Sequence, residues 1–265
     1  MTTTALEVAS SLIESVQMTG HRTLRAYAME AKYEFLRMLR APSFGAIFLL
    51  LPVLLYLLFG VVIFGGALRN DPKAAIGVFT GFSVFGVMGP AMFGYGVTIA
   101  IEREQGLLRL KRALPMPPAA YLMAKMLMAV LFAALIMIAM CIAASTLGHV
   151  RMTPLQFLAM SLINVAGVLP FCAIGLFIGS IAKAAAAPGF TNLVYLPMMY
   201  LSGLFFPLPK FLQTVAPIWP SYHLEALALT ALGVGSTSST LSHLAVLVLV
   251  TVVFTALALR RLVKE

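Results

Sequence analysis

Side chains that could carry out chemistry are sparse in this sequence, which has nine Asp and Glu residues, four His and two Cys. Cys141 and Cys172 lie in apolar stretches with no second Cys or His at metal-ligand spacing, which favours buried thiols over a zinc site or a disulfide. His223 and Glu225 are close enough in the sequence to suggest a hydrolase site or a proton relay, but we interpret them as an exposed polar tip. We therefore predict no catalytic residue and no metal site.

Nucleotide-binding chemistry is also missing from the sequence. It has no Gly-x-x-x-x-Gly-Lys-Ser/Thr motif, the loop whose backbone cradles phosphate groups. Its long apolar stretches also have no carboxylate near their centres, where a proton-coupled carrier would use one. We therefore predict that the chain has no ATP-hydrolysing site of its own.

The composition places the chain in a membrane. Of its 265 residues, 61% are hydrophobic and only 10% are charged, and the mean hydropathy is +1.00. A soluble domain has roughly 25% charged residues. A soluble core cannot absorb this apolar excess, because a globule needs polar surface in proportion to its area. We predict an all-α membrane protein whose surplus apolar surface faces lipid.

Six stretches of the sequence approach the roughly 20 apolar residues that a membrane-spanning helix needs. They run near residues 44–66, 74–101, 121–147, 155–181, 188–206 and 241–259. The first segment, residues 1–20, contains Glu7 and Glu14 and lacks a basic start, so we expect a cytoplasmic tail and not a secretory signal. Residues 21–265 are expected to form one transmembrane domain.

The positive charges predict how the spans are oriented. Of the 18 Lys and Arg residues, 14 lie before span one, after span six, or around the loops that follow spans two and four. The other four are Arg69, Lys73, Arg151 and Lys210. Cytoplasmic loops carry the excess of cations, so both termini are expected in the cytoplasm. This placement explains the net charge of +9 without a nucleic-acid partner.

The segment 21–41 precedes the first span and has the pattern of an amphipathic helix. Its cations Arg22, Arg25 and Lys32 lie off the apolar face. That face is formed at spacings of three and four by Leu24, Ala28, Ala31, Phe35 and Met38. Such a helix can lie along the membrane surface, with its cations toward anionic lipid headgroups. A cytosolic helix packed on a partner is the alternative.

Two connecting segments carry more information than the spans. Residues 101–127 follow span two and begin with the charged residues Glu102, Arg103 and Glu104. A short basic helical turn comes next. Such an amphipathic segment between two spans could be bound by a soluble motor protein. Residues 201–229 contain four prolines, which exclude one continuous helix. Trp219 and Tyr222 in this second segment suit the headgroup zone. We expect short broken helices there that re-enter the outer membrane face.

These two segments together resemble the type-2 ATP-binding-cassette (ABC) exporter permeases. Glu102–Leu110 matches that family's cytoplasmic signature, and Lys125 matches its Lys at the start of span three. Ser202–Pro207 and Pro220–Ala226 match its second signature. The resemblance covers nearly all of residues 20–262, and it departs from the family at Leu107, where Thr is common.

The resemblance implies a transport subunit that binds no cofactor and leaves ATP and Mg to a partner ABC ATPase. It implies two permease copies in a bacterial inner membrane, with segment 21–41 as an elbow helix. Coupling to the ATPase is expected at Glu102, Arg103, Glu104, Gln105, Gly106, Arg109 and Lys111. Spans two and five would face the dimer axis, which points to a substrate path along Phe85, Met88, Met92, Tyr195, Met198 and Met199.

The apolar spans and their lack of buried charge favour an amphipathic or hydrophobic cargo, such as a drug, a lipid or a lipid-linked molecule. Two other classes of protein remain open from the residues alone. One is an intramembrane enzyme, either a hydrolase or a lipid-modifying protein, and the other is a secondary carrier. Co-purification with an ATPase would discriminate the exporter from both.

Overall fold

The structure is a computed structural model that describes residues 20–112, 118–148, 150–235 and 239–262. Within these ranges, the side chains of 20–23, 42–44, 109, 111, 112 and 118–120 are outside the description. The predicted tail, residues 1–20, therefore lies outside the described residues except for Gly20. Every regular element of the described ranges is helical, which confirms the predicted all-α class.

The helices follow one another with short connections. The first half contains α2 (Gly20–Arg40), α3 (Pro42–Tyr56), the π-helical segment η1 (Leu57–Ile63), α4 (Gly65–Leu68), α5 (Pro72–Gly89), the π-helical segment η2 (Pro90–Val97), α6 (Thr98–Glu104) and α7 (Leu107–Arg112). The second half contains α8 (Pro118–Thr146), α9 (Pro154–Ala166), α10 (Val168–Ile181), α11 (Ala187–Leu201), α12 (Lys210–Gln213), the 3-10 turn η3 (Ala216–Ile218), α13 (Pro220–Ala231) and α14 (Thr240–Leu262).

Among the described residues, five continuous helical stretches are long and apolar enough to cross a membrane. They are Gly45–Ile63, Pro72–Glu104, Tyr121–Thr146, Pro154–Ile181 and Thr240–Leu262. The sixth predicted span, 188–206, corresponds to α11, which has 15 residues. At 1.5 Å per residue such a helix covers only about 22 Å, short of the roughly 30 Å hydrocarbon core. The structure therefore confirms a protein with several membrane-spanning helices.

The sequence marks where several of these helices begin and bend. The Asp71 carboxylate accepts the backbone N–H groups of Lys73 and Ala74, both at 3.1 Å, and so caps α5. Thr153 and Gln156 form a capping box at the start of α9. Pro90 has no N–H to donate, and the helix continues from it as the π-helical segment η2.

The α5–η2–α6 stretch is the most buried of the five, while the α3–η1 stretch and α14 are the most exposed. The close approach of η2 to α10 depends on glycine residues in both elements. A Cβ on Gly96 would collide with the backbone of Gly175, and a Cβ on Gly179 would collide with the carbonyl of Gly96. Small residues that let helix backbones touch are the usual device in membrane helix packing.

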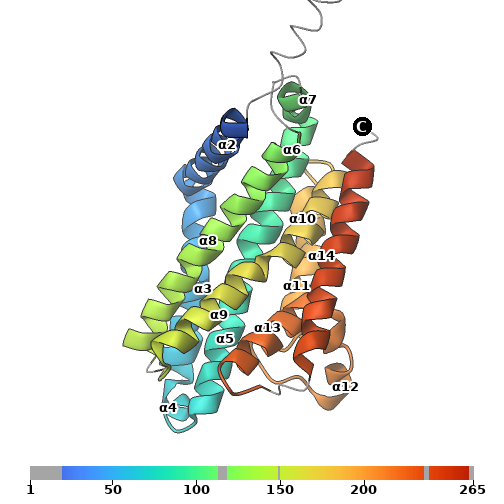
Figure 1. Cartoon of the computed structure of the whole chain (residues 1–265). Coiled ribbons are helices and arrows are strands. Elements are labelled where there is room, and N and C mark those ends of the chain that lie inside the picture. Colours follow the sequence, from blue (N-terminus) through green and yellow to red (C-terminus); the bar gives the residue numbers. More distant parts are fainter. Residues whose placement is uncertain (1–19, 113–117, 149, 236–238, 263–265) are drawn as a thin grey trace, which may run out of the picture.

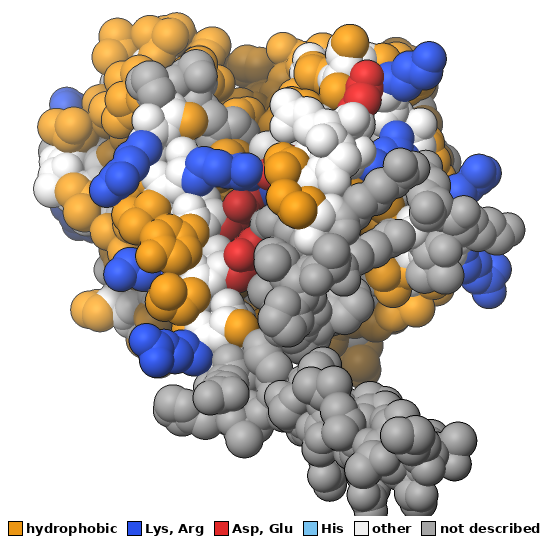
Figure 2. Space-filling model, turned by 90° about the horizontal axis from the view of Figure 1, so that it is seen from above, with side chains coloured by type: hydrophobic (Ala, Val, Ile, Leu, Met, Phe, Trp, Pro, Cys, Tyr) orange, Lys and Arg blue, Asp and Glu red, His pale blue; other side chains and the backbone are white. Residues whose placement is uncertain are grey.

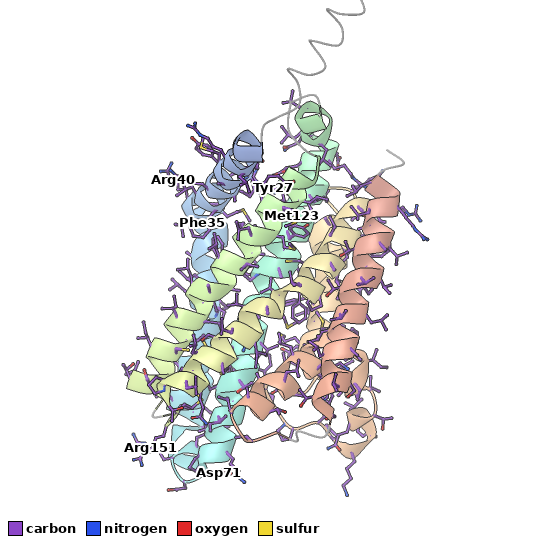
Figure 3. All side chains as sticks on the ribbon, viewed as in Figure 1. Tyr27, Phe35, Arg40, Asp71, Met123 and Arg151 are labelled. Carbon is purple, nitrogen blue, oxygen red and sulfur yellow. The ribbon has the colours of Figure 1, made fainter. Side chains whose placement is uncertain are left out.

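Figure 1 shows the helices running side by side between two ends of the molecule. One end carries α2, α7 and the C-terminal end of α14, and we call it the α2 end. The opposite end carries α4 and α12, and we call it the α12 end. In Figure 3, Phe35 and Arg40 lie at the α2 end, and Asp71 and Arg151 lie at the α12 end. The predicted short helices between α11 and α14 are α12, η3 and α13.

Candidate coupling site

The predicted coupling segment lies at the α2 end, where α6 turns into α7. Glu102, Arg103 and Glu104 form the last turn of α6. Gly106 follows with a φ of 75°, a left-handed conformation that glycine adopts without the strain of a side chain. This turn ends α6 and redirects the chain into the short helix α7.

Lys125 is the centre of an ion cluster behind this turn. It lies near the start of α8, and its side chain is 0% exposed. Its ammonium group donates to the Glu34 carboxylate, to Glu102 Oε1 at 3.1 Å and to Thr98 Oγ1 at 3.1 Å. A buried ammonium is strongly unfavourable unless it is paired and hydrogen-bonded. Lys125 can therefore be both buried and charged only because the carboxylates of Glu34 and Glu102 pair with it.

Arg37 completes the cluster from the exposed side. Its guanidinium contacts Glu34 Oε1 at 2.8 Å and also binds Glu102. The hydroxyl of Tyr121 donates to the other oxygen of Glu102. We call Glu34, Arg37, Glu102 and Lys125 the four-charge cluster. It contains two carboxylates and two cations, so it is neutral as a whole, and it joins α2, α6 and α8.

The charges of the cluster reinforce one another at Arg37. Partial burial works against the charged guanidinium, but the carboxylates of Glu102 and Glu34 outweigh that effect and raise the pKa of Arg37 above its ordinary value. Arg37 is thus a permanent cation at the rim of the cluster.

Arg103 and Glu104 attach the same turn to a fourth element, the end of α10. The Arg103 guanidinium donates to the carbonyls of Ser180 and Ala182, the latter at 2.8 Å. The carbonyls of a helix's last turn have no partner within the helix, so a cation there satisfies them and suits the helix dipole. The Glu104 carboxylate accepts the backbone N–H of Ala184 at 2.6 Å, just beyond that end.

The structure thus gives the predicted coupling residues different roles. Glu102 is buried, while Gln105 and Glu104 are exposed on the turn. Arg109 and Lys111 lie on α7, but their side chains are outside the described residues. Figure 2 views the molecule from this end and shows Lys and Arg side chains distributed over the face with a few acidic side chains among them.

Residues 26–232 match the family described as ABC-2 type transporter, which is most of the chain. The chain belongs to the ABC-2 type transporter family. A curated relative, the "Putative transport permease YvfS" of Bacillus subtilis (strain 168), is 28% identical over 144 residues. The aligned part is 53% of this chain and 59% of that relative, so it spans less than two thirds of the relative's length. The family indicates a transport permease and confirms the resemblance seen in the sequence.

The predicted substrate-path residues of this ABC-2 permease all lie in the interior of the chain. Met88, Met92 and Met198 are fully buried, and Phe85, Tyr195 and Met199 are nearly so. Phe85 and Tyr195 pack with ring centroids 6.0 Å apart. Their role in a path stays a prediction. The large apolar side chains exposed on α11 are instead Phe190, Leu193, Leu196 and Tyr200.

The predicted elbow segment is helical and corresponds to α2 of the ABC-2 permease. Arg25 and Lys32 are exposed, and the Arg22 side chain is outside the described residues. Phe35 packs on Phe132 of α8, with ring centroids 5.4 Å apart. The sequence predicted an apolar face from Leu24 to Met38 that lies in the membrane surface. In the structure Ala31 and Met38 of that face, together with Glu34, pack toward α8, while Leu24 is 72% exposed.

Sequence reasoning missed Glu34 and Tyr121 as members of the site. A signal existed, because Lys125 lies at the start of an apolar stretch and must find carboxylates there. Glu34 was available at helical spacing from Ala31 and Met38, which share the buried face of α2.

The prediction that His223 lies in an exposed polar tip is wrong. That side chain is 6% exposed and pairs with His243, not with Glu225.

Proposed function

We propose that this chain is the membrane subunit of an ATP-driven exporter, in which a separate ABC ATPase hydrolyses ATP. Membership in the ABC-2 family supports a transport role. The sequence contains no phosphate-binding Gly-x-x-x-x-Gly-Lys-Ser/Thr motif, which supports hydrolysis by another polypeptide. In this proposal two copies of the permease form the transport path and each copy receives one ATPase subunit.

The four-charge cluster is the observation that carries the coupling proposal. It lies directly behind the α6–α7 turn and joins that turn to α2 and α8, while Arg103 and Glu104 join it to the end of α10. Separating buried ion pairs is costly, so these elements should move together when the turn moves. An ATPase that binds the turn could therefore act on several helices at once.

The proposed membrane arrangement places the α2 end in the cytoplasm of a bacterial inner membrane. The excess of Lys and Arg at that end supports both termini being cytoplasmic. We propose α11 as the sixth span, extended by the turn that follows it, and α12, η3 and α13 as segments that re-enter the outer face. In this arrangement α2 lies along the lipid headgroups as an elbow helix.

The proposed substrate is amphipathic or hydrophobic, in keeping with the apolar surface of the spans. The exposed face of α11 supports this proposal, because Leu193 is 69% exposed and Tyr200 is 59% exposed. A second copy facing α11 would enclose these side chains and create an apolar path with an aromatic lining. Phe85 and Tyr195 would then support the path from behind, and the buried methionines would provide adaptable packing.

Reconstitution with the candidate ATPase tests this function. The permease should co-purify with an ATPase in equal amounts and stimulate its hydrolysis in lipid nanodiscs. Replacing all of 102–106 would also remove a counter-ion from buried Lys125, so a single exposed position is the sharper probe. Gln105→Trp should lower stimulation by about tenfold or more, while Lys210→Trp, an exposed position at the α12 end, should not.

Two results would overturn the proposal. One is a Gln105→Trp variant that stimulates the ATPase as well as the unmodified chain, which removes the turn from coupling. The other is a permease that purifies without any ATPase and moves substrate on an ion gradient or cleaves it, as a carrier or an intramembrane enzyme would.

A further inference from the structure

A cavity of about 440 Å³ lies at the α12 end, opposite the coupling site. Its wall is formed by α13, the start of α14 and the chain between α11 and α13. The described residues that line it are Ser202, Gly203, Leu208, Gln213, Ala216, Tyr222, Glu225, Ala226, Leu229, Thr230, Gly235, Ser239 and His243. This volume lies within the range of small-molecule sites, and the lining combines apolar walls with a few polar groups.

Glu225 is the acidic group of this cavity. It lies on α13, it is partly buried, and it makes no hydrogen bond or ion pair with another described residue. Burial raises the pKa of its carboxyl to about 8. The described lining contains no Lys or Arg, and its other titratable groups are Tyr222 on α13 and His243 on α14. The carboxyl therefore lines an open pocket whose described residues give it no counter-ion.

The two histidines beside the cavity bond to each other and to groups other than Glu225. His223 Nε2 contacts the Pro217 carbonyl at 2.8 Å, so this nitrogen must carry the proton. His223 Nδ1 then accepts from His243 Nδ1 at 2.7 Å, and His243 Nε2 accepts from the Ser239 hydroxyl at 3.0 Å. In this arrangement both rings are neutral, and a pair that shares one added proton fits as well, because the Ser239 hydroxyl can also accept from His243 Nε2.

We propose that this cavity binds a small molecule through a primary ammonium group, with the Glu225 carboxylate as its counter-ion. An ammonium group supplies the charge and the donors that the described lining does not give this carboxylate. Tyr222 and the leucine side chains would contact the apolar part of the ligand. The site needs neither the ATPase nor a second copy, so it is independent of the proposed function.

Equilibrium binding to the purified permease, without ATP or ATPase, tests the site. Tyramine is a suitable probe, and 4-ethylphenol is its matched control because it lacks only the amine. Tyramine should bind at least tenfold more tightly than 4-ethylphenol, and Glu225→Gln should remove this preference. Asp71→Asn is the control variant, because it removes another acid at the same end of the molecule and Asn still caps α5.

The unmodified protein offers a second measurement that needs no substitution. Tyramine keeps its charge up to about pH 9, so only ionisation of Glu225 should limit binding, and affinity should rise about tenfold per pH unit toward pH 8. Equal affinity for tyramine and 4-ethylphenol overturns the proposal, as does a Glu225→Gln variant that still prefers tyramine.

Discussion

Lys125 and Glu34 are 91 residues apart in the sequence and form a buried ion pair. Glu34 comes from the helix that precedes the first span, and Lys125 from the start of α8. The side chains are 5% and 0% exposed. This pair fixes α2 against the body of the permease by charge, while Phe35 and Phe132 fix it by apolar packing.

The first prediction concerns the loss of Lys125. Lys125→Met keeps most of the side-chain volume but leaves Glu34 and Glu102 buried beside each other with Arg37 as their remaining cation. Removing one partner of a buried pair costs about 3–5 kcal/mol. Unfolding in mixed detergent micelles should show a loss of that size. Arg40→Gln, which removes an exposed cation on α2, should change stability by less than about 0.5 kcal/mol.

The double variant separates charge from packing in the same experiment. Glu34→Gln removes one of the two carboxylates that Lys125→Met leaves without an ammonium. The double variant should therefore be more stable than Lys125→Met alone, by about 1 kcal/mol or more. Additive losses would mean that the two residues do not interact, which contradicts the ion pair.

The second prediction concerns the glycine crossing between η2 and α10. Gly179→Ala places a Cβ against the Gly96 carbonyl, so the helices must separate, at a cost of about 1–3 kcal/mol. Gly77→Ala is the matched control, because no heavy atom lies within 4 Å of the added Cβ. In this case alanine should stabilise the helix by about 0.5–1 kcal/mol. Thermal unfolding followed by circular dichroism distinguishes the two variants, and equal shifts would count against the crossing.

The spans could be predicted from the sequence because apolar length is a local property. Five of the six predicted stretches have helices of sufficient length, and α11 is shorter because Ser202 and Gly203 end it before Phe206. The local pattern did not reveal which side of a helix packs inward. Leu24 and Met38 belong to one predicted apolar face, yet Met38 is buried and Leu24 is exposed, since both lipid and protein accept an apolar face.

The candidate site was only partly predictable for a different reason. The charged run at Glu102–Glu104 was visible, but its function as an internal junction depends on residues from α2, α8 and α10. Glu34 is 68 residues from Glu102 in the sequence, and periodicity within one segment cannot bring them together. His223 and His243 likewise come from α13 and α14, and their contact arises from packing at the α12 end.

The third prediction concerns Arg103 at the end of α10. Arg103→Gln removes charged donors from the carbonyls of Ser180 and Ala182, and hydrogen bonds to charged groups are worth about 1.5–3 kcal/mol. The last turn of α10 should open more often, so its amide hydrogens should exchange roughly 10- to 100-fold faster. Hydrogen exchange with mass spectrometry measures this. Exchange at the start of α9, which has its own capping box, should be unchanged and serves as the internal control.

The fourth prediction is a pH dependence that arises from Glu225. The pKa of this carboxyl is about 8 in the folded protein, above its ordinary value of 4.5. The folded state therefore holds the proton more tightly than the unfolded state. The associated stability is fully present below about pH 4.5 and is lost as the pH rises through 8. Melting temperatures of the unmodified permease should fall relative to those of Glu225→Gln between pH 5 and 9. Parallel pH profiles would show that Glu225 titrates in the folded protein as it does in water.

Adding tyramine at pH 8 should raise the melting temperature of the unmodified protein and not that of the Glu225→Gln variant, because only the ionised carboxylate gains a partner.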